Sequence, residues 1–403
     1  MQSQKSVLLS ISRGTVICVV LRRRTDRYIY QGAYFDSTLF ALAKWPPQKI
    51  PRISIVQDPP QEIRTERRTF AQPIVFFLLD PHLSVLIHSP SIAHSMTALR
   101  LRLPSRPVAR PLCISLPEQK DVYYSPEASP VVPNLEFLDL STCGVIEEEL
   151  EMILARFRNL KHLIIDECLQ AVIGLDEWGE LGKRCALVGV HRAREREKEL
   201  KARLEEGKAA EGQQALGSDG GPAQLIMNPG TGNEPRRQRL GRRGLATPTL
   251  SIRDHSSGIP RAPGSPKPPL SKIRILPFVP RLVTLAMTDP IGVQSCRHAS
   301  MRSDFEAGWA EGMAQLEVTY ARLRTSLRHG VRVLREDVES QSVGMNGMEG
   351  LEDVDADDDE AFTVTRDTPP ILCLAGPRKN RFHVPNCGHL VGWNIWHETL
   401  AND

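Results

Sequence analysis

The sequence predicts an α/β fold in which an irregular solenoid, a fragment of a horseshoe, carries long helices and disordered insertions. Three observations favour it. Residues 134–168 repeat their own pattern after 25 positions. The segment between the two copies has the apolar spacing of an amphipathic helix. Residues 305–334 carry a second, longer apolar stripe.

The self-similar stretch reads L-x-x-L-x-[LI]-x-x-C twice. Leu135, Leu138, Leu140 and Cys143 match Leu160, Leu163, Ile165 and Cys168, each 25 residues later. A period of about 20 to 29 residues with this pattern is the leucine-rich-repeat signature. We expect the alternating apolar residues to point inward from a short strand. Both cysteines should lie buried against neighbouring backbone, as ladder residues rather than metal ligands or nucleophiles.

The segment between the copies predicts a helix. Its apolar residues follow the i, i+4, i+7, i+8, i+11 spacing of an amphipathic helix: Ile146, Leu150, Ile153, Leu154 and Phe157. One such unit cannot bury its core alone, so about three or more are expected. Residues 96–101 and 282–287 are weaker copies, and 273–276 and 249–252 are further candidate strands. Two chance matches within an ordinary α/β domain are the alternative.

Composition divides the chain of 403 residues into six parts. They are an N-terminal strand-like region (1–69), a first part of the repeat body ending in a charged helix (70–206), a mostly disordered basic and proline-rich insertion (207–271), a last repeat strand with a long amphipathic helix (272–337), an acidic disordered linker (338–370) and a C-terminal cap segment (371–403).

The long helix is expected to begin at a capping box formed by Ser303 and Glu306. From Phe305 to Leu334 its apolar residues recur every three or four positions, a stripe about 45 Å long. Its second half is basic, with Arg322, Arg324, Arg328, Arg332 and Arg335. We expect packing on the solenoid with a solvated basic edge; a coiled-coil partner or an acidic ligand is the alternative. The acidic residues 352–360 could contact this arginine-rich helix, or the basic loop at 235–243, within the same chain.

Charge and cysteine usage bound the class of protein. The formal charge is +3, from 51 basic and 48 acidic residues, which does not suggest a global nucleic-acid binder. The eight cysteines show no CxxC pair and are expected to be reduced, in a cytoplasmic or nuclear protein. The apolar runs near the N-terminus are shorter than the roughly 20 residues that span a bilayer, so we expect no membrane association.

Signatures of catalysis are missing from the sequence. It contains no G-x-S-x-G elbow, H-E-x-x-H pair, Walker loop or kinase motif, so we predict no catalytic residues and no cofactor. The tail carries His383, Cys387, His389 and His397, with Cys373 upstream. A metal site is one interpretation, but these spacings fit no familiar zinc pattern. We therefore predict no metal site, and instead a packed terminal strand and cap that buries Trp393 and Trp396.

The repeats, together with the helices at 182–206 and 305–335, resemble the leucine-rich-repeat body of fungal F-box-like proteins over residues 70–335. In that family an N-terminal F-box binds the adaptor of a cullin-type ubiquitin ligase, and the repeats select a substrate. The resemblance implies a protein that acts by binding rather than by catalysis. Residues 1–50 contain no Leu-Pro-led F-box motif, so no adaptor-binding residues are assigned.

Two functions follow from these observations. The first is a non-enzymatic protein-interaction module, with the substrate-recognition subunit of a cullin-type ligase as its specific form. Its partner would contact the exposed strand positions Glu136, Phe137, Asp139, Lys161, His162 and Ile164. The alternative is a nuclear nucleic-acid-associated factor that uses the arginine-rich helix and a basic cluster, Arg236, Arg237, Arg239, Arg242 and Arg243, of a kind that can bind an import receptor or a phosphate backbone.

Overall fold

A computed structural model gives the fold. It describes residues 8–12, 16–21, 44, 52–57, 83–84, 86–87, 89, 92, 95–103, 105–113, 132–168, 177–216, 273–288, 295–336, 351–355, 358, 360–364, 368–377 and 382–397. The chain forms two compact units, one of Met1–Leu200 with Lys272–Asp403 and one of Lys201–Ser271. Every element named below belongs to the first unit, except the C-terminal part of the long helix α6.

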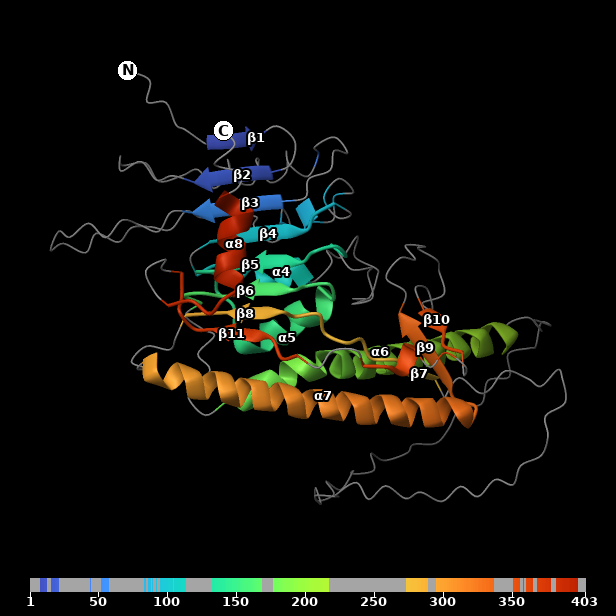
Figure 1. The fold of residues 1–403 in the computed structure, drawn as a ribbon. Helices are drawn as coiled ribbons and strands as arrows, with labels where there is room; N and C mark the ends of the chain where they lie inside the picture. The colour runs from blue at the N-terminus through green and yellow to red at the C-terminus, as the bar shows by residue number, and fades with distance from the viewer. Residues whose placement is uncertain are drawn as a thin grey trace, which may run out of the picture. The chain divides into compact units, whose positions relative to one another are not determined.

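The main sheet has eight strands that follow the order of the chain (Figure 1). They are β1 (Leu8–Ser12), β2 (Val16–Leu21), β3 (Arg52–Gln57), β4 (Ala98–Arg102), β5 (Phe137–Asp139), β6 (His162–Ile164), β8 (Thr284–Ala286) and β11 (Ile371–Cys373). Only β1 and β2 pair antiparallel, and every other neighbouring pair is parallel. The central strands have a common register, because Leu138 pairs with Leu163, which pairs with Leu285.

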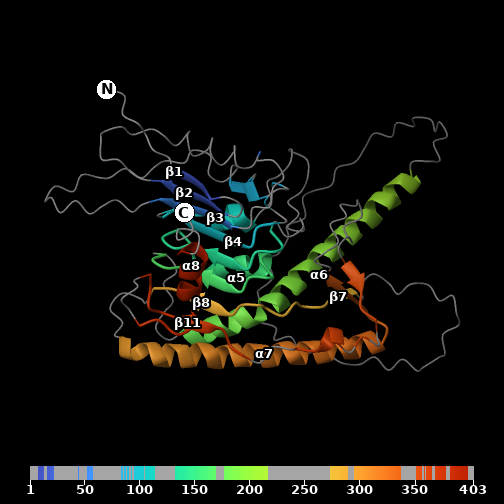
Figure 2. The same cartoon turned by 45° about the horizontal axis from the view of Figure 1, so that its top comes forward.

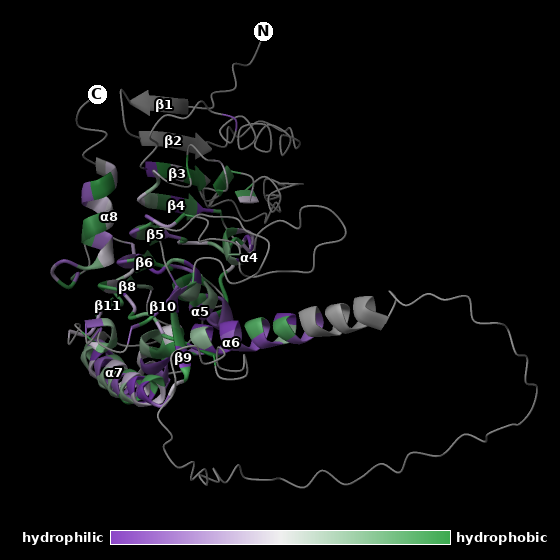
Figure 3. Ribbon diagram, turned by 90° about the vertical axis from the view of Figure 1, so that its right-hand side faces the viewer, coloured by the Kyte–Doolittle hydropathy of each residue, from purple (hydrophilic) through white to green (hydrophobic). Residues whose placement is uncertain are grey.

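Helices cover both faces of this sheet. Figure 3 shows α4 (Ala109–Cys113) and α5 (Glu147–Arg156) on one side, and α8 (Gly388–His397) on the other. Side chains alternate between faces along a strand. Leu138, Leu163 and Leu285 therefore join the core under α5, while Phe137, Ile164 and Ala286 join a second, smaller core under α8. Strands buried on both faces are typical of parallel sheets.

The predicted leucine-rich-repeat solenoid is wrong: the structure shows a mostly parallel sheet packed with helices on both faces. A horseshoe keeps its inner strand face open, and here α8 covers that face. The two motif copies do lie side by side as β5 and β6, and the helix expected between them is α5. An apolar alternation occurs in any buried parallel strand, so the pattern predicted strands correctly and the architecture incorrectly.

The prediction for the two repeat cysteines is confirmed. Cys143 and Cys168 are buried. The Cys143 thiol donates to the carbonyl oxygen of Leu101 at 3.3 Å, and that of Cys168 to the carbonyl oxygen of Leu140 at 3.4 Å. Each sulfur therefore satisfies backbone of the preceding strand. The weaker copies also form strands, since 96–101 overlaps β4 and 282–287 contains β8, whereas 249–252 lies outside the described residues.

A second sheet contains β7 (Ile273–Ile275), β9 (Arg332–Glu336) and β10 (Leu351–Asp353), in the order β10-β9-β7. Part of the segment expected to be a disordered acidic linker is therefore a strand. Its carboxylates pair with the arginines of β9: Asp353 with Arg332 at 2.7 Å, and Glu352 with Arg335 at 3.6 Å. The suggested contact between the acidic stretch and these arginines is present. Two 3-10 turns, η2 (Ser295–Arg297) and η3 (Glu360–Phe362), complete the named elements.

Two long helices, α6 (Trp178–Leu216) and α7 (His298–Arg328), pack against each other beside β11, as Figure 2 shows for α7. The helix α7 begins five residues before the expected capping box at Ser303 and ends before Arg332. Its apolar stripe from Phe305 to Leu323 is buried. Among the described helices, none is long and apolar enough to cross a membrane.

Glycines allow the backbones of α6 and α7 to touch. A Cβ atom at Gly308 would overlap the carbonyl oxygen of Gly179, and one at Gly182 would overlap the carbonyl oxygen of Phe305. Because those obstacles are helical backbone, no side-chain rotamer change relieves the overlap. Only glycine permits this separation of the two helix axes.

We predict that Gly308→Leu lowers the free energy of unfolding by about 1–3 kcal/mol, because the leucine side chain overpacks the helix contact. Leucine has the higher helix propensity, so propensity alone would predict the opposite sign. The matched control is Ala310→Leu, at an exposed position two residues away on α7, which should change stability by less than about 0.5 kcal/mol. Denaturant unfolding measures both. Equal stabilities of the two variants would contradict the close helix contact.

Candidate metal centre

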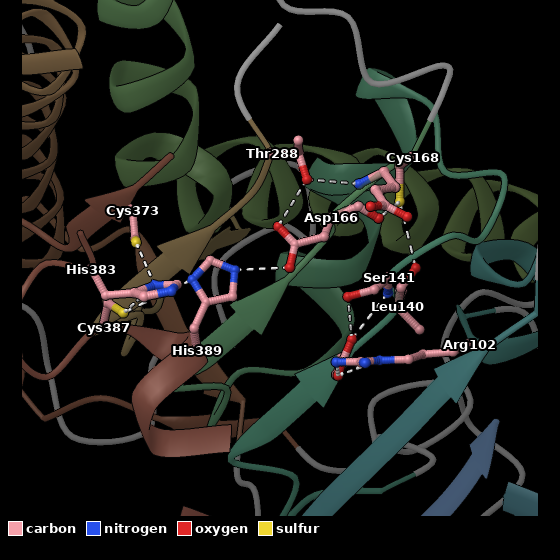
Figure 4. A network of polar contacts seen from close by, with 12 residues as sticks. Arg102, Leu140, Ser141, Asp166, Cys168, Thr288, Cys373, His383, Cys387 and His389 are labelled. Atoms are coloured by element: carbon pink, nitrogen blue, oxygen red, sulfur yellow. Dashed lines mark hydrogen bonds and ion pairs between the residues drawn. The ribbon is translucent and has the colours of Figure 1, made fainter. Parts of the chain in front are cut away.

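Four side chains that can bind a metal converge beside β11. The ligand atoms of Cys373, His383, Cys387 and His389 all lie within 4.8 Å of one another. Cys373 ends β11, His389 lies in the first turn of α8, and the other two precede that helix. Figure 4 shows the two imidazoles and the two sulfurs facing one another.

The chain reaches this geometry through a tight turn before α8. Asn386 adopts a left-handed conformation, with φ of 59°, which asparagine tolerates better than most residues. The N–H of Cys387 donates to the carbonyl oxygen of Val384 at 3.1 Å. Gly388 then packs closely against the sheet, since a Cβ atom at this position would come within 2.9 Å of Thr284 Oγ1. The turn therefore brings Cys387 and His389 down onto the strand that ends in Cys373.

The separations between ligand atoms are close to those of a tetrahedral site. His383 Nδ1 lies 3.8 Å from Cys373 Sγ and 3.9 Å from Cys387 Sγ. His389 Nδ1 lies 3.9 Å from Cys387 Sγ. With Zn–S near 2.3 Å and Zn–N near 2.0–2.1 Å, neighbouring sulfur and nitrogen ligands are about 3.5 Å apart. These three sulfur–nitrogen pairs are a few tenths of an ångström wider than in a zinc site, and all four ligand atoms lie within 4.8 Å of one another, so a modest contraction of the cluster would fit a zinc ion.

One ligand imidazole has a carboxylate behind it. His389 Nε2 lies 2.8 Å from Asp166 Oδ2, and its other nitrogen faces the sulfurs. Both side chains are buried, with 3% and 0% of their area exposed. Metal-binding histidines usually donate their second N–H to a carboxylate in this manner. The cluster therefore has the outer hydrogen bond of a metal site as well as the four ligands.

The charges in the cluster differ from those around the other buried thiols. Hydrogen bonding from Cys387, with a further contribution from His389, lowers the pKa of the Cys373 thiol despite its burial. Burial lowers the pKa of His389, but hydrogen bonds with Asp166 and Cys373 outweigh it and raise the pKa to about 9. At Cys185, by contrast, burial raises the thiol pKa to about 12. Only the thiolate binds metal, so the environment favours Cys373 as a ligand, whereas the same hydrogen bond and burial raise the pKa of the Cys387 thiol.

The residues predicted to bind a partner are not one exposed surface. Phe137 and Ile164 are 1% and 2% exposed, because they lie in the core under α8. Asp139 is fully buried. The expectation that these three side chains are exposed is therefore wrong. They are buried because a helix covers this part of the sheet.

The other three predicted positions lie nearer the surface. Glu136 and Lys161 form an ion pair of 2.7 Å, with 48% and 41% of their side chains exposed. The half-buried His162 is held by Thr284, whose Oγ1 lies 3.0 Å from Nδ1. The basic cluster at 236–243 lies outside the residues that the structure describes.

Sequence reasoning named all four cluster residues and set them aside on spacing. The order Cys-x9-His-x3-Cys-x-His lacks the closely spaced cysteine pair of familiar zinc motifs. Its two cysteines are far apart in sequence because one of them, Cys373, lies on a strand of the sheet. The signal available was the density of cysteine and histidine in a short tail. Of the two tryptophans expected in the cap, Trp396 is buried and Trp393 is half-buried, in contact with His383 at 4.9 Å between ring centroids.

Comparison with family models, with curated proteins and with solved structures found no match for this chain.

Asp139 anchors two arginines at the end of β5. Its Oδ2 accepts hydrogen bonds from Arg102 at 3.0 and 2.7 Å and lies 3.3 Å from the guanidinium of Arg100. We predict that Asp139→Ala lowers the free energy of unfolding by about 3 kcal/mol, because the two cations then lack their buried partner. The control Glu136→Ala removes an exposed pair and should cost less than about 1 kcal/mol.

Low pH should remove the stabilisation that Asp139 and its two arginines give to the wild-type chain. Burial raises the pKa of Asp139, but Arg102 and Arg100 outweigh it and lower the pKa below its ordinary value. The stabilisation is thus present above the unfolded pKa of about 4 and is lost as pH falls through the lower folded value. Denaturant unfolding should show the gap between wild type and Asp139→Ala closing in that window. A gap independent of pH would contradict the ionised pair.

Proposed function

We propose that the protein binds one Zn²⁺ with Cys373, His383, Cys387 and His389, and that the ion is a structural centre. The observation that carries the proposal is the convergence of four zinc-type ligand atoms within 4.8 Å. Three of the four side chains are buried. Bringing two thiols and two imidazoles together in a buried site is costly without a group that satisfies them all.

The donor set favours zinc. Two thiolates and two imidazoles in a tetrahedral arrangement are typical of zinc, whereas magnesium and calcium prefer oxygen ligands. Catalytic zinc sites keep one position for water or substrate, while structural sites take four ligands from the protein. Because this chain supplies four, the ion would have no open position, which supports a structural role.

The ion would fasten α8 to the sheet. Cys373 belongs to the edge strand β11 and His389 to the first turn of α8, so one ion links the strand with the helix that covers it. An isolated helix of ten residues is marginal in water, and α8 depends on its contacts for stability. The metal would supply the attachment at its N-terminal end.

The rest of α8 is held by packing on the strands. Its ring contact places Trp396 edge-on to Phe137, with centroids 6.2 Å apart. Arg100 lies over the Trp396 ring at 4.4 Å, and Arg52 donates to the carbonyl oxygen of Ile395 at 3.1 Å. These contacts secure the C-terminal end of the helix. The proposed ion and the tryptophan thus attach the two ends separately.

A protein-interaction role, with a cullin-ligase substrate receptor as its specific form, stays a prediction from the sequence. The covered face no longer supplies Phe137 or Ile164 as partner contacts. Of the six predicted positions, Glu136 is exposed and Lys161 partly exposed. The nucleic-acid alternative rests on Arg236–Arg243 and also stays a prediction.

We predict that the reduced full-length chain binds one equivalent of Zn²⁺ or Co²⁺. The Co²⁺ complex should show the absorption of a tetrahedral ion with sulfur-to-metal charge transfer. Cys373→Ser should weaken binding by more than about 100-fold, since loss of an outer-shell partner alone costs about 10–100-fold. The control Cys185→Ala removes a buried thiol of α6 and should leave stoichiometry and spectrum unchanged. Equal binding by the two variants would contradict the assigned ligands.

Chelation should loosen α8 selectively. Hydrogen exchange of the full chain, with and without a strong zinc chelator, should show faster exchange of backbone amides in residues 382–397 when the metal is removed. The amides in the middle of α7 should not change, because that helix is held by its own buried apolar stripe. If the amides of residues 382–397 exchange at the same rate with and without the metal, the fastening role is contradicted.

A further inference from the structure

We propose that Asp166 is the positioning residue of this metal centre. Its carboxylate holds the His389 ring with Nε2 protonated, so that Nδ1 becomes the ligand atom, and it thereby sets the affinity for the ion. The inference rests on the proposed function and deepens it, because it identifies a residue, in the segment that follows β6, that controls the same site.

The hydrogen bond defines the tautomer of His389. A neutral imidazole carries one N–H, and the other nitrogen has the lone pair that binds metal. Asp166 Oδ2 lies 2.8 Å from Nε2, and as a hydrogen-bond acceptor at that position it favours the form with hydrogen on Nε2. The free lone pair is then on Nδ1, 3.9 Å from Cys387 Sγ. The orientation required for coordination is thus set from behind the ring.

Asp166 is itself held in place, through both its carboxylate and its backbone. Thr288 Oγ1 donates to Asp166 Oδ1 at 3.2 Å, and the backbone N–H of Glu167 donates to Thr288 Oγ1 at 3.1 Å. The backbone carbonyl of Asp166 accepts from the N–H of Thr142 at 2.7 Å. Figure 4 shows this chain of contacts leading from Thr288 through Asp166 to His389. Segments that follow β5, β6 and β8 therefore fix the group that orients the ligand.

A buried ion pair between Asp166 and a charged His389 is the competing explanation. It would stabilise the fold without any metal. The arrangement beyond the ring argues for the metal role, because the edge opposite Asp166 faces a thiol and lies near a second imidazole, His383, at 5.0 Å between ring centroids. An ion pair needs none of the other three members of the cluster, Cys373, His383 and Cys387.

The chain offers a matched control in Asp139. Like Asp166, it is fully buried and lies at the carboxyl end of a central strand. Its hydrogen bonds go to Arg102 and Ser141 and not to a metal ligand. Asp139→Asn therefore makes the same change of charge at the same depth without touching the site.

The test measures zinc affinity of full-length variants by competition with a chromophoric chelator. Asp166→Asn should bind about 10–100-fold more weakly than wild type, while its Co²⁺ spectrum stays tetrahedral. Asp139→Asn should bind within about 2-fold of wild type, although its stability falls. Asp166→Ala, which offers no acceptor, should lose at least as much affinity as Asp166→Asn.

A second readout separates positioning from general stability. Long-range ¹⁵N–¹H spectra of the zinc-loaded wild type should show His389 with hydrogen on Nε2. In the metal-free chains, at a pH where this ring is neutral, the wild type should keep that form and Asp166→Asn should show a mixture of the two tautomers. Wild-type affinity in Asp166→Asn, or equal losses in the two asparagine variants, would overturn the inference. Failure of the wild-type chain to take up zinc would instead contradict the proposed function.

Discussion

Burial of the central strands on both faces is the constraint on which the rest of the structure depends. The strands β5, β6 and β8 are only three residues long, and most of their side chains are buried whichever way they point. A sheet of this kind must be covered twice. The cover on the leucine side is extensive, since α4, α5, α6 and α7 contribute to one continuous core. Within the part of the chain that the structure describes, the helix that covers the other side is α8, of ten residues.

That asymmetry explains why the four ligands lie where they do. A short helix buries too little apolar area to hold itself firmly on a sheet, so its attachment needs a stronger local interaction. The metal ligands lie at the N-terminal end of α8, whereas Trp396 packs at its C-terminal end. The ligands include Cys373, the last residue of the edge strand β11. We regard the centre as a fastening for the weaker of the two covers. The carboxylate of Asp166 strengthens the same attachment, because it bonds the ligand His389 to the segment that follows the central strand β6.

Local pattern in the sequence predicted much of the fold. The 25-residue spacing placed β5, α5 and β6 correctly, and the burial of Cys143 and Cys168 followed from the same alignment. The solenoid was wrong because alternating apolar residues describe the strand and not what covers it. The start of α7 was missed because Ser303 and Glu306 match a capping box although the helix already runs through them. The strand β10 was missed because its acidic residues indicate disorder unless their arginine partners, far off in sequence, are known.

The metal centre could be predicted only in part, for a similar reason. Its ligands were visible, but Cys373 is brought to the other three by the pairing of β11 with β8, which no spacing rule contains. Asp166 lies more than 200 residues before His389, as their separation of 223 positions shows, and nothing local marks it as an outer partner. Contacts set by sheet order, rather than by neighbouring residues, decide both assignments.

The most direct test of the account is X-ray absorption at the zinc edge of the full-length chain, loaded with one equivalent of Zn²⁺. The account predicts a first shell of two sulfurs near 2.3 Å and two nitrogens near 2.0–2.1 Å, with the outer scattering of imidazole. A shell of oxygen and nitrogen alone, or an ion bound too weakly to survive gel filtration, would contradict it.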